Sequence, residues 1–189
     1  MFNNIEFQPL TGETWSHFEM LFGEKGACGG CWCMWWRLKR SEFEKQKGEK
    51  NKEAMRQIVK SGEIPGIIAY YKQEPVAWCS VAPRETFPSL NRSRILKPVD
   101  DKPVWSIVCF FIAKSYRKMG LSVRMLEYVI EFCRRQGAKI LEGYPVHPKK
   151  PSMPDVFAWT GFLSAFQKAG FKEVARRSPT RPIMRYELE

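Results

Sequence analysis

The stretch of sequence that decides the fold is IVCFFIAKSYRKMGLSVRMLEYVIE, residues 107–131. The run 104–113, between Pro103 and Lys114, is nearly all apolar, and this pattern predicts a buried strand. Residues 121–136 place apolar side chains on one face at helical spacing, which predicts an amphipathic helix. A buried strand, a short turn and a helix therefore follow one another directly.

The turn between them has the features of an anion-binding site. The first N–H groups of a helix have no partner within the helix, and together with the helix dipole they favour a phosphate. Gly120 lets the backbone approach a ligand closely, and Arg117 and Lys118 add positive charge. The alternative is an ordinary strand–turn–helix with a solvated basic turn.

The sequence RKMGLS at 117–122 resembles the pyrophosphate-binding motif of the GCN5-related N-acetyltransferases (GNAT), Arg/Gln-x-x-Gly-x-Gly/Ala. Arg117 and Gly120 match its first two fixed positions, and Ser122 replaces the last small residue. Its place after an apolar strand and before an amphipathic helix strengthens the resemblance.

A second segment supports the same family. AFQKAGF, residues 165–171, is similar to the family signature in which a helix ends in Phe-Tyr-Glu-Lys-x-Gly-Phe, with Phe166 at the usual tyrosine position. The segment EGYPV at 142–146 and the stretch CGGCWCMWWR at 28–37 also resemble a bacterial subgroup of this family.

The order of predicted elements agrees with the fold that this resemblance implies. It is a mixed α/β acyl-CoA N-acyltransferase fold, a mostly antiparallel central sheet with one parallel strand–helix–strand crossover, in a single N-acetyltransferase domain over residues 1–189. We predict strands at 4–10, 64–71, 76–82, 104–113, 139–146, 171–176 and 182–188. We predict helices at 11–23 (with Thr11 as N-cap), 41–48, 50–61, 87–90, 121–136 and 160–169.

Composition narrows the class of protein. A chain of 189 residues with 44% hydrophobic residues can bury a core, and no apolar run reaches the roughly 20 residues that span a membrane. The N-terminus lacks the pattern of a signal peptide, so we expect a cytoplasmic protein without disulfides. The net charge of +11 suits an anionic partner, but no nucleic-acid motif or basic tail is present.

The resemblance implies acetyl transfer from acetyl-CoA, as co-substrate, directly to an amine. The turn residues would hold the pyrophosphate, backbone N–H groups near Phe110 and Ile112 would hold pantetheine and polarise the thioester, and Phe166 would lie beside the cofactor. The residues expected to bind the cofactor are Phe110, Ile112, Arg117, Lys118, Gly120, Leu121, Ser122 and Phe166.

The proton-transfer groups are predicted less directly. Phe166 cannot donate a proton, so Tyr144 is the first substitute, unless it is an interfacial tyrosine with a satisfied hydroxyl. Strand alternation places Glu142 among apolar neighbours, where desolvation favours a general base, unless it is a structural acid paired with an arginine. His147 is the other candidate, with a solvated or substrate-rim role favoured by its Pro-rich loop.

The cysteine-rich stretch allows several interpretations. Cys28, Cys31 and Cys33 have spacings that can bind zinc, but no fourth ligand follows in a recognisable pattern, so no metal is predicted. In the family this region covers the acceptor side, which makes Cys31, Trp32 and Cys33 candidates for the substrate pocket. Aromatic packing on the core is the structural alternative.

We therefore expect an N-acetyltransferase that acts on a small amine, with a protein N-terminus or lysine as the alternative acceptor. We expect a monomer or homodimer without a nucleic-acid or membrane partner. The aromatic loop hints at an acceptor of apolar or cationic character. One alternative is a non-catalytic acyl-CoA-binding or regulatory module on the same fold. Another is a basic nucleic-acid binder, which would show DNA affinity that falls steeply with salt.

Overall fold

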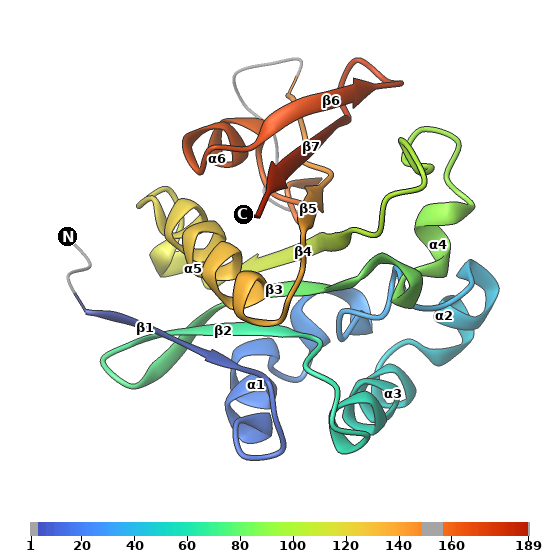
Figure 1. The fold of residues 1–189 in the computed structure, drawn as a ribbon. Coiled ribbons are helices and arrows are strands. Elements are labelled where there is room, and N and C mark those ends of the chain that lie inside the picture. The colour runs from blue at the N-terminus through green and yellow to red at the C-terminus, as the bar shows by residue number, and fades with distance from the viewer. Residues whose placement is uncertain (1–3, 149–156, 189) are drawn as a thin grey trace.

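The computed structural model of the protein describes residues 4–148 and 157–188 (Figure 1). The strands are β1 (Ile5–Pro9), β2 (Gly66–Tyr71), β3 (Glu74–Pro83), β4 (Trp105–Ile112), β5 (Ile140–Gly143), β6 (Lys172–Arg176) and β7 (Pro182–Glu187). The helices are α1 (Trp15–Phe22), α2 (Arg40–Gln46), α3 (Glu49–Lys60), α4 (Pro88–Asn91), α5 (Leu121–Arg135) and α6 (Leu163–Lys168), with π-helical η1 (Gly26–Gly30) and 3-10 turns η2 (Arg84–Thr86) and η3 (Lys114–Tyr116).

These strands form one sheet in the order β1-β2-β3-β4-β5-β7-β6. β4 and β5 are parallel and are joined through α5, whereas the other neighbouring pairs are antiparallel. The predicted mixed sheet with a single parallel crossover is therefore confirmed for the described residues.

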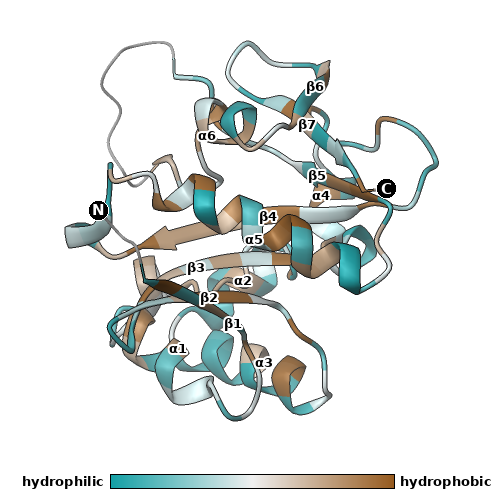
Figure 2. Ribbon diagram, turned by 60° about the vertical axis from the view of Figure 1, so that its left-hand side comes forward, coloured by the Kyte–Doolittle hydropathy of each residue, from teal (hydrophilic) through white to brown (hydrophobic). Residues whose placement is uncertain are grey.

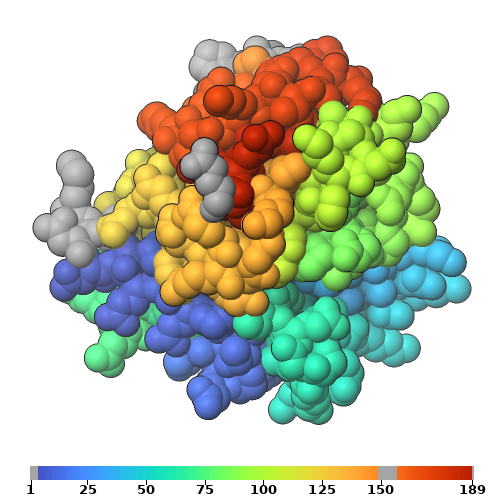
Figure 3. Space-filling model, in the orientation of Figure 1, coloured from blue at the N-terminus to red at the C-terminus, as the bar shows by residue number. Residues whose placement is uncertain are grey.

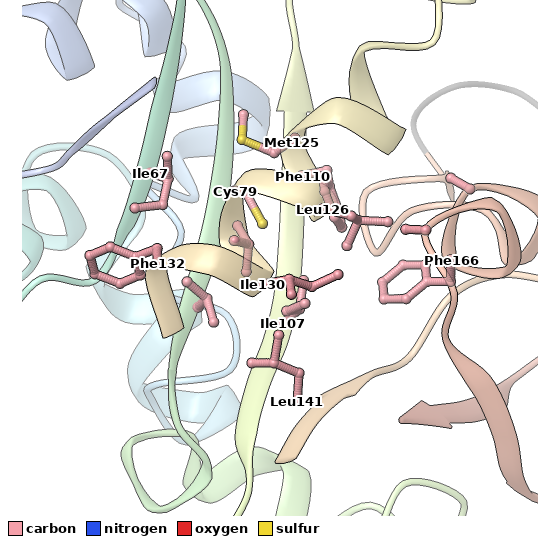
Figure 4. Packing of buried hydrophobic residues seen from close by; sticks show 14 of the residues in the cluster. Ile67, Cys79, Ile107, Phe110, Met125, Leu126, Ile130, Phe132, Leu141 and Phe166 are labelled. Atoms are coloured by element: carbon pink, nitrogen blue, oxygen red, sulfur yellow. The ribbon is translucent and has the colours of Figure 1, made fainter. Parts of the chain in front are cut away.

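One face of the sheet is covered by α5, whose apolar side meets the central strands. Met125, Leu126 and Ile130 from α5 lie beside Ile107 and Leu141 from the sheet in Figure 4. β4 is apolar over most of its length in Figure 2, because side chains on both of its faces pack against other elements. Seen from outside in Figure 3, α5 separates the N-terminal part of the chain from the C-terminal part.

The other face carries a second core that is rich in aromatic rings. Trp78 from β3 packs against Phe18 and Phe22 of α1. Trp32, from the cysteine-rich stretch, packs on the same rings. The stretch is also fixed to the start of α3, since the Gly48 N–H and the Asn51 side-chain amide both donate to the Gly30 carbonyl, at 3.0 and 3.1 Å.

Three boundaries differ from the predictions by three residues or more. α1 begins at Trp15 instead of after Thr11, because the Thr14 hydroxyl donates to the Pro9 carbonyl and accepts from the Thr11 N–H in a preceding turn. β5 ends at Gly143, three residues early. α6 starts at Leu163, whose N–H donates to the Val146 carbonyl outside the helix.

Within the described ranges, no helix has the length and apolar character that crossing a membrane requires.

Candidate active site

The sheet opens between its two parallel strands. β4 pairs with β5 only over Trp105–Ile107, opposite Leu141–Gly143. Beyond Ile107 the two strands separate, so the backbone of β4 from Val108 onwards does not pair with β5. This separation leaves backbone groups of a central strand available for something that is not a strand of the sheet.

The predicted anion-binding turn lies at the start of α5. Gly120 occupies the N-cap position with φ +80°, and no atom lies within 4 Å of where its Cβ would be. Leu121 is buried and anchors the helix in the core, while Lys118 and Gly120 are exposed. The Arg117 Nε donates to the Ile112 carbonyl at 2.8 Å, which ties the turn to the end of β4. Backbone N–H groups of the first helical turn, at Leu121 and Ser122, could donate to an anion at this position.

The edge of β4 is occupied by the chain itself. The Phe110 N–H donates to the Trp159 carbonyl at 2.6 Å. On the other side, the Val146 N–H donates to the Gly161 carbonyl, and Val146 forms a parallel bridge with Phe162. The segment 159–162 therefore fills the gap between the separated strands.

Phe166 lies at the point of separation and is fully buried. Its ring packs edge-on against Phe110 and Phe171, at centroid distances of 6.0 and 5.0 Å. Only a glycine fits opposite it, because a Cβ at Gly143 would lie 2.1 Å from the ring. Figure 4 shows Phe166 on the C-terminal side of this core, where it fills space and offers no proton.

Glu142 does not lie among apolar neighbours, and that part of the sequence interpretation is wrong. Its carboxylate is fully buried and accepts hydrogen bonds from Arg84 Nη1 at 2.9 Å and from Arg185 Nε at 2.7 Å. Arg185 also holds Asp100 through both terminal nitrogens. Alternation along β5 cannot reveal these partners, because both arginines come from other strands or turns. This geometry favours the structural acid over the general base.

Tyr144 belongs to the same cluster. Its hydroxyl is within hydrogen-bond distance of Glu142 (2.7 Å), Arg84 (2.6 Å) and Ser106 (2.8 Å). Burial, reinforced by the Glu142 carboxylate, raises the pKa of Tyr144 well above its usual value. Because the Tyr144 hydroxyl is buried and already has three hydrogen-bond partners, the geometry favours a structural tyrosine over a residue that donates a proton to the leaving thiolate.

The cysteine-rich stretch builds a different polar cluster under β3 and β4. Cys33 is buried, and its Sγ accepts from the Trp78 Nε1–H at 3.3 Å. A hydrogen bond with Cys109, the Trp78 indole and the Arg37 guanidinium lower the pKa of Cys33 to about 7, against the effect of burial. The same hydrogen bond with Cys33 raises the pKa of Cys109 well above its usual value.

Arg37 stands out in this cluster. Its guanidinium lies 4.7 Å from the centroid of the Phe87 ring. Its Nε and Nη2 are buried without a hydrogen-bond partner among the described residues. Burial accordingly lowers the pKa of Arg37.

The remaining predicted pocket residues are dispersed. Trp32 is buried in the aromatic core, and Cys31 is half-buried, where burial raises its pKa to about 11. His147 is exposed, with Nδ1 2.9 Å from Arg176 Nη1. Cys28 is exposed, and among the described residues no three or more His, Cys, Asp or Glu side chains are placed to hold a metal ion.

Sequence reasoning placed Trp35 and Trp36 in an aromatic loop on the acceptor side, but it missed Trp159 and the gap that the three tryptophans surround. The Trp36 Nε1–H donates to the Val108 carbonyl at 3.1 Å, on the separated part of β4. Trp159 lies 5.7 Å from Trp36 and 6.2 Å from Trp35, measured between ring centroids. The double tryptophan in the cysteine-rich stretch was a usable signal, but nothing in the sequence pairs it with Trp159.

The comparisons with known proteins agree with this geometry. The family model of the Acetyltransferase (GNAT) family matches residues 32–153. No protein of curated function matches the chain.

Several solved structures share the fold. A GNAT acetyltransferase from Streptococcus agalactiae has a TM-score of 0.59 and 13% identity, covering 100% of this chain and 98% of its own. An N-acetyltransferase from Staphylococcus aureus has a TM-score of 0.57 and 9% identity, with 99% and 100% covered. The PaiA N-acetyltransferase of Thermoplasma acidophilum, in complex with coenzyme A, has a TM-score of 0.54 and 14% identity, with 97% and 99% covered.

Proposed function

Because the chain belongs to the GNAT acetyltransferase family, we propose that it transfers the acetyl group of acetyl-CoA to the amine of a small molecule. The observation that carries this proposal is the separation of β4 from β5 next to the open N-terminus of α5. One feature suits a pyrophosphate, and the other suits an extended pantetheine chain that pairs with a strand edge. Acetyl-CoA carries both groups, a pyrophosphate and an extended pantetheine chain, in one molecule.

The cofactor would lie with its pyrophosphate over Gly120–Ser122 and its thioester at Phe110. The Phe110 N–H would then polarise the thioester carbonyl, as a backbone donor does in an oxyanion hole. Because the Trp159 carbonyl accepts this same N–H at 2.6 Å, it has to leave before the thioester can bind. Binding of acetyl-CoA therefore includes an opening step in segment 159–162.

The reaction is a direct attack. The amine nitrogen forms a bond to the thioester carbonyl carbon, the carbon–sulfur bond breaks, and coenzyme A leaves as a thiolate. The nitrogen loses one proton and the thiolate gains one.

In this scheme Glu142 and Tyr144 have positioning roles. They join β5 to Arg84, at the end of β3, and so hold the strands where they separate. The amine then loses its proton to solvent. Because Phe166 cannot donate a proton, the coenzyme A thiolate takes its proton from solvent or from the acceptor.

Thiol release tests the proposal. The protein is mixed with acetyl-CoA and a panel of small amines, and free coenzyme A is measured with a thiol reagent against a blank without amine. Thiol release that depends on one class of amine, with the N-acetyl product identified by mass, is the expected result. Binding of acetyl-CoA without amine-dependent release across the panel would contradict it.

That second outcome would favour a non-catalytic acyl-CoA-binding module. Two observations favour this second function. Phe166 stands at the position where the family usually has a proton-donating tyrosine, and the Phe110 N–H already donates to the Trp159 carbonyl.

A further inference from the structure

We propose that a cavity beside Trp35 and Trp36 binds the acceptor, and that the acceptor is an amine carrying an anionic group, a carboxylate or a phosphate. This inference rests on the proposed function, because it names the class of acceptor. The cavity has a volume of about 270 Å³ and is lined by Trp35, Trp36, Arg40, Ser89, Arg92 and Ser93. Its size suits a small molecule or one end of a larger one.

The cavity lies next to the position proposed for the thioester. Trp36 forms one of its walls and donates its indole N–H to the Val108 carbonyl, two residues before Phe110. Trp35 and Trp36 both contact Trp159, the residue whose carbonyl accepts the Phe110 N–H. Trp36 and Trp159 therefore connect the cavity with the Phe110 N–H, where the thioester would bind. The displacement of Trp159 by acetyl-CoA would remove one of these two rings.

The charge of the cavity is one-sided. Arg40 and Arg92 contribute two guanidinium groups, and within residues 4–148 and 157–188 no carboxylate lines the cavity. Arg40 lies 5.1 Å from the Trp35 ring centroid, and its ion pair with Glu44 is long, at 4.0 Å. Such a pair of arginines favours an anion, and disfavours the cationic acceptor that the aromatic residues alone suggested.

Polar groups add to this preference, and the walls are fixed. Ser89 accepts from Arg92 Nη2 at 3.1 Å and donates to the Leu38 carbonyl at 2.7 Å. Its N–H donates to the Trp36 carbonyl at 3.2 Å. These bonds join α4 to the cysteine-rich stretch, so Arg92 and Trp36 are held at one opening, which Arg40 also lines. The apolar part of an acceptor would stack on the rings while its anion meets the guanidinium groups.

Matched acceptors test the charge of the ligand. Acetyl transfer is measured with each protein amino acid and its amide, and with 2-aminoethyl phosphate and ethanolamine. The first set tests a carboxylate, and the second tests a phosphate. Because the members of a pair differ in amine basicity, the decisive quantity is the change in their kcat/KM ratio between the wild type and a variant.

The variants are Arg92→Gln and Arg40→Gln, with Arg94→Gln as the control. Arg94 is exposed in the same segment and does not line the cavity. Its substitution by glutamine therefore removes one positive charge outside the cavity. We expect each cavity variant to lower kcat/KM for the anionic member about tenfold and to change the uncharged member less than about twofold. Arg94→Gln should leave the ratio unchanged.

The outcomes separate this inference from the proposed function. Acetylation confined to uncharged or cationic amines, or a ratio that none of the cavity variants changes, would overturn the anionic cavity while the acetyltransferase stands. If acetyl-CoA binds but no amine is acetylated, the proposed function fails, and calorimetry with N-acetylphenylalanine and its amide decides on the cavity. Binding of the carboxylate that Arg92→Gln abolishes would support it, and no such binding would overturn it.

Discussion

Two polar clusters lie under the same sheet, and they differ in how fully their charges are matched. In the first, the Glu142 carboxylate accepts from Arg84 and Arg185 at 2.9 and 2.7 Å, and Tyr144 completes the set. In the second, Cys33 Sγ accepts from the Trp78 Nε1–H at 3.3 Å, whereas Arg37 keeps two buried nitrogens without a partner among the described residues.

The difference separates polar groups that stabilise the fold from a buried charge that adds little to its stability. A buried ion pair with complete hydrogen bonds holds elements together and is costly to break from one side. Buried guanidinium nitrogens without hydrogen bonds, such as Nε and Nη2 of Arg37, are costly to keep. From the sequence, Glu142 and Tyr144 were the candidates for proton transfer. In the structure, the buried charge without hydrogen bonds belongs to Arg37, in the cysteine- and tryptophan-rich stretch.

The largest expected effect is in the matched cluster. Glu142→Gln leaves Arg84 and Arg185 without their shared negative charge, so we expect a loss of about 3–5 kcal/mol in the free energy of unfolding, measured with urea. Asp100→Asn, at the exposed partner of Arg185, should change stability far less. A stable Glu142→Gln protein with a greatly reduced kcat would instead make Glu142 the general base.

The unmatched cluster should respond in the opposite way. Arg37→Met removes two buried nitrogens without partners and keeps a long apolar side chain over Phe87, so we expect stability within about 1 kcal/mol of the wild type, or higher. The matched variant is Arg84→Met, which should lose about 3 kcal/mol or more. Equal losses for the two substitutions, by urea unfolding, would remove the distinction between the clusters.

A smaller effect concerns the pH dependence of stability. The pKa of Cys33 is lowered from 9.0 to about 7 in the folded protein. The stabilisation that the Cys33 thiolate adds to the free energy of unfolding is therefore fully present above pH 9 and is lost as the pH falls through about 7. We expect Cys33→Ser to reduce the gain in stability between pH 7 and 9 by on the order of 1 kcal/mol, measured by urea unfolding in reductant. Cys31→Ser is the control, because burial raises the pKa of Cys31 to about 11. A far-ultraviolet thiolate titration near pH 7 that persists in Cys33→Ser would contradict the assignment.

The sequence could predict the local part of this architecture and not the long-range part. The strand, turn and helix around Gly120 follow from apolar periodicity and one glycine, and each lies within a short window. The partners of Glu142 lie 58 and 43 residues away, so no window along β5 contains them. Trp159 reaches Phe110 because the chain leaves the sheet after Gly143 and returns, and a segment without periodicity carries no signal for such a path.

The central claim is that this fold binds acetyl-CoA at the start of α5, and calorimetry tests it most directly. Acetyl-CoA is titrated into the wild type, Gly120→Glu and Gly137→Glu. The two glycines have φ values of +80° and +79° with no atom within 4 Å of a Cβ, and they lie at opposite ends of the same helix. Both substitutions should therefore cost similar stability.

We predict that wild type and Gly137→Glu bind acetyl-CoA alike, and that Gly120→Glu loses at least roughly a hundredfold in affinity, about 2.7 kcal/mol. A folded wild type that does not bind acetyl-CoA, or equal binding by all three proteins, would contradict the account.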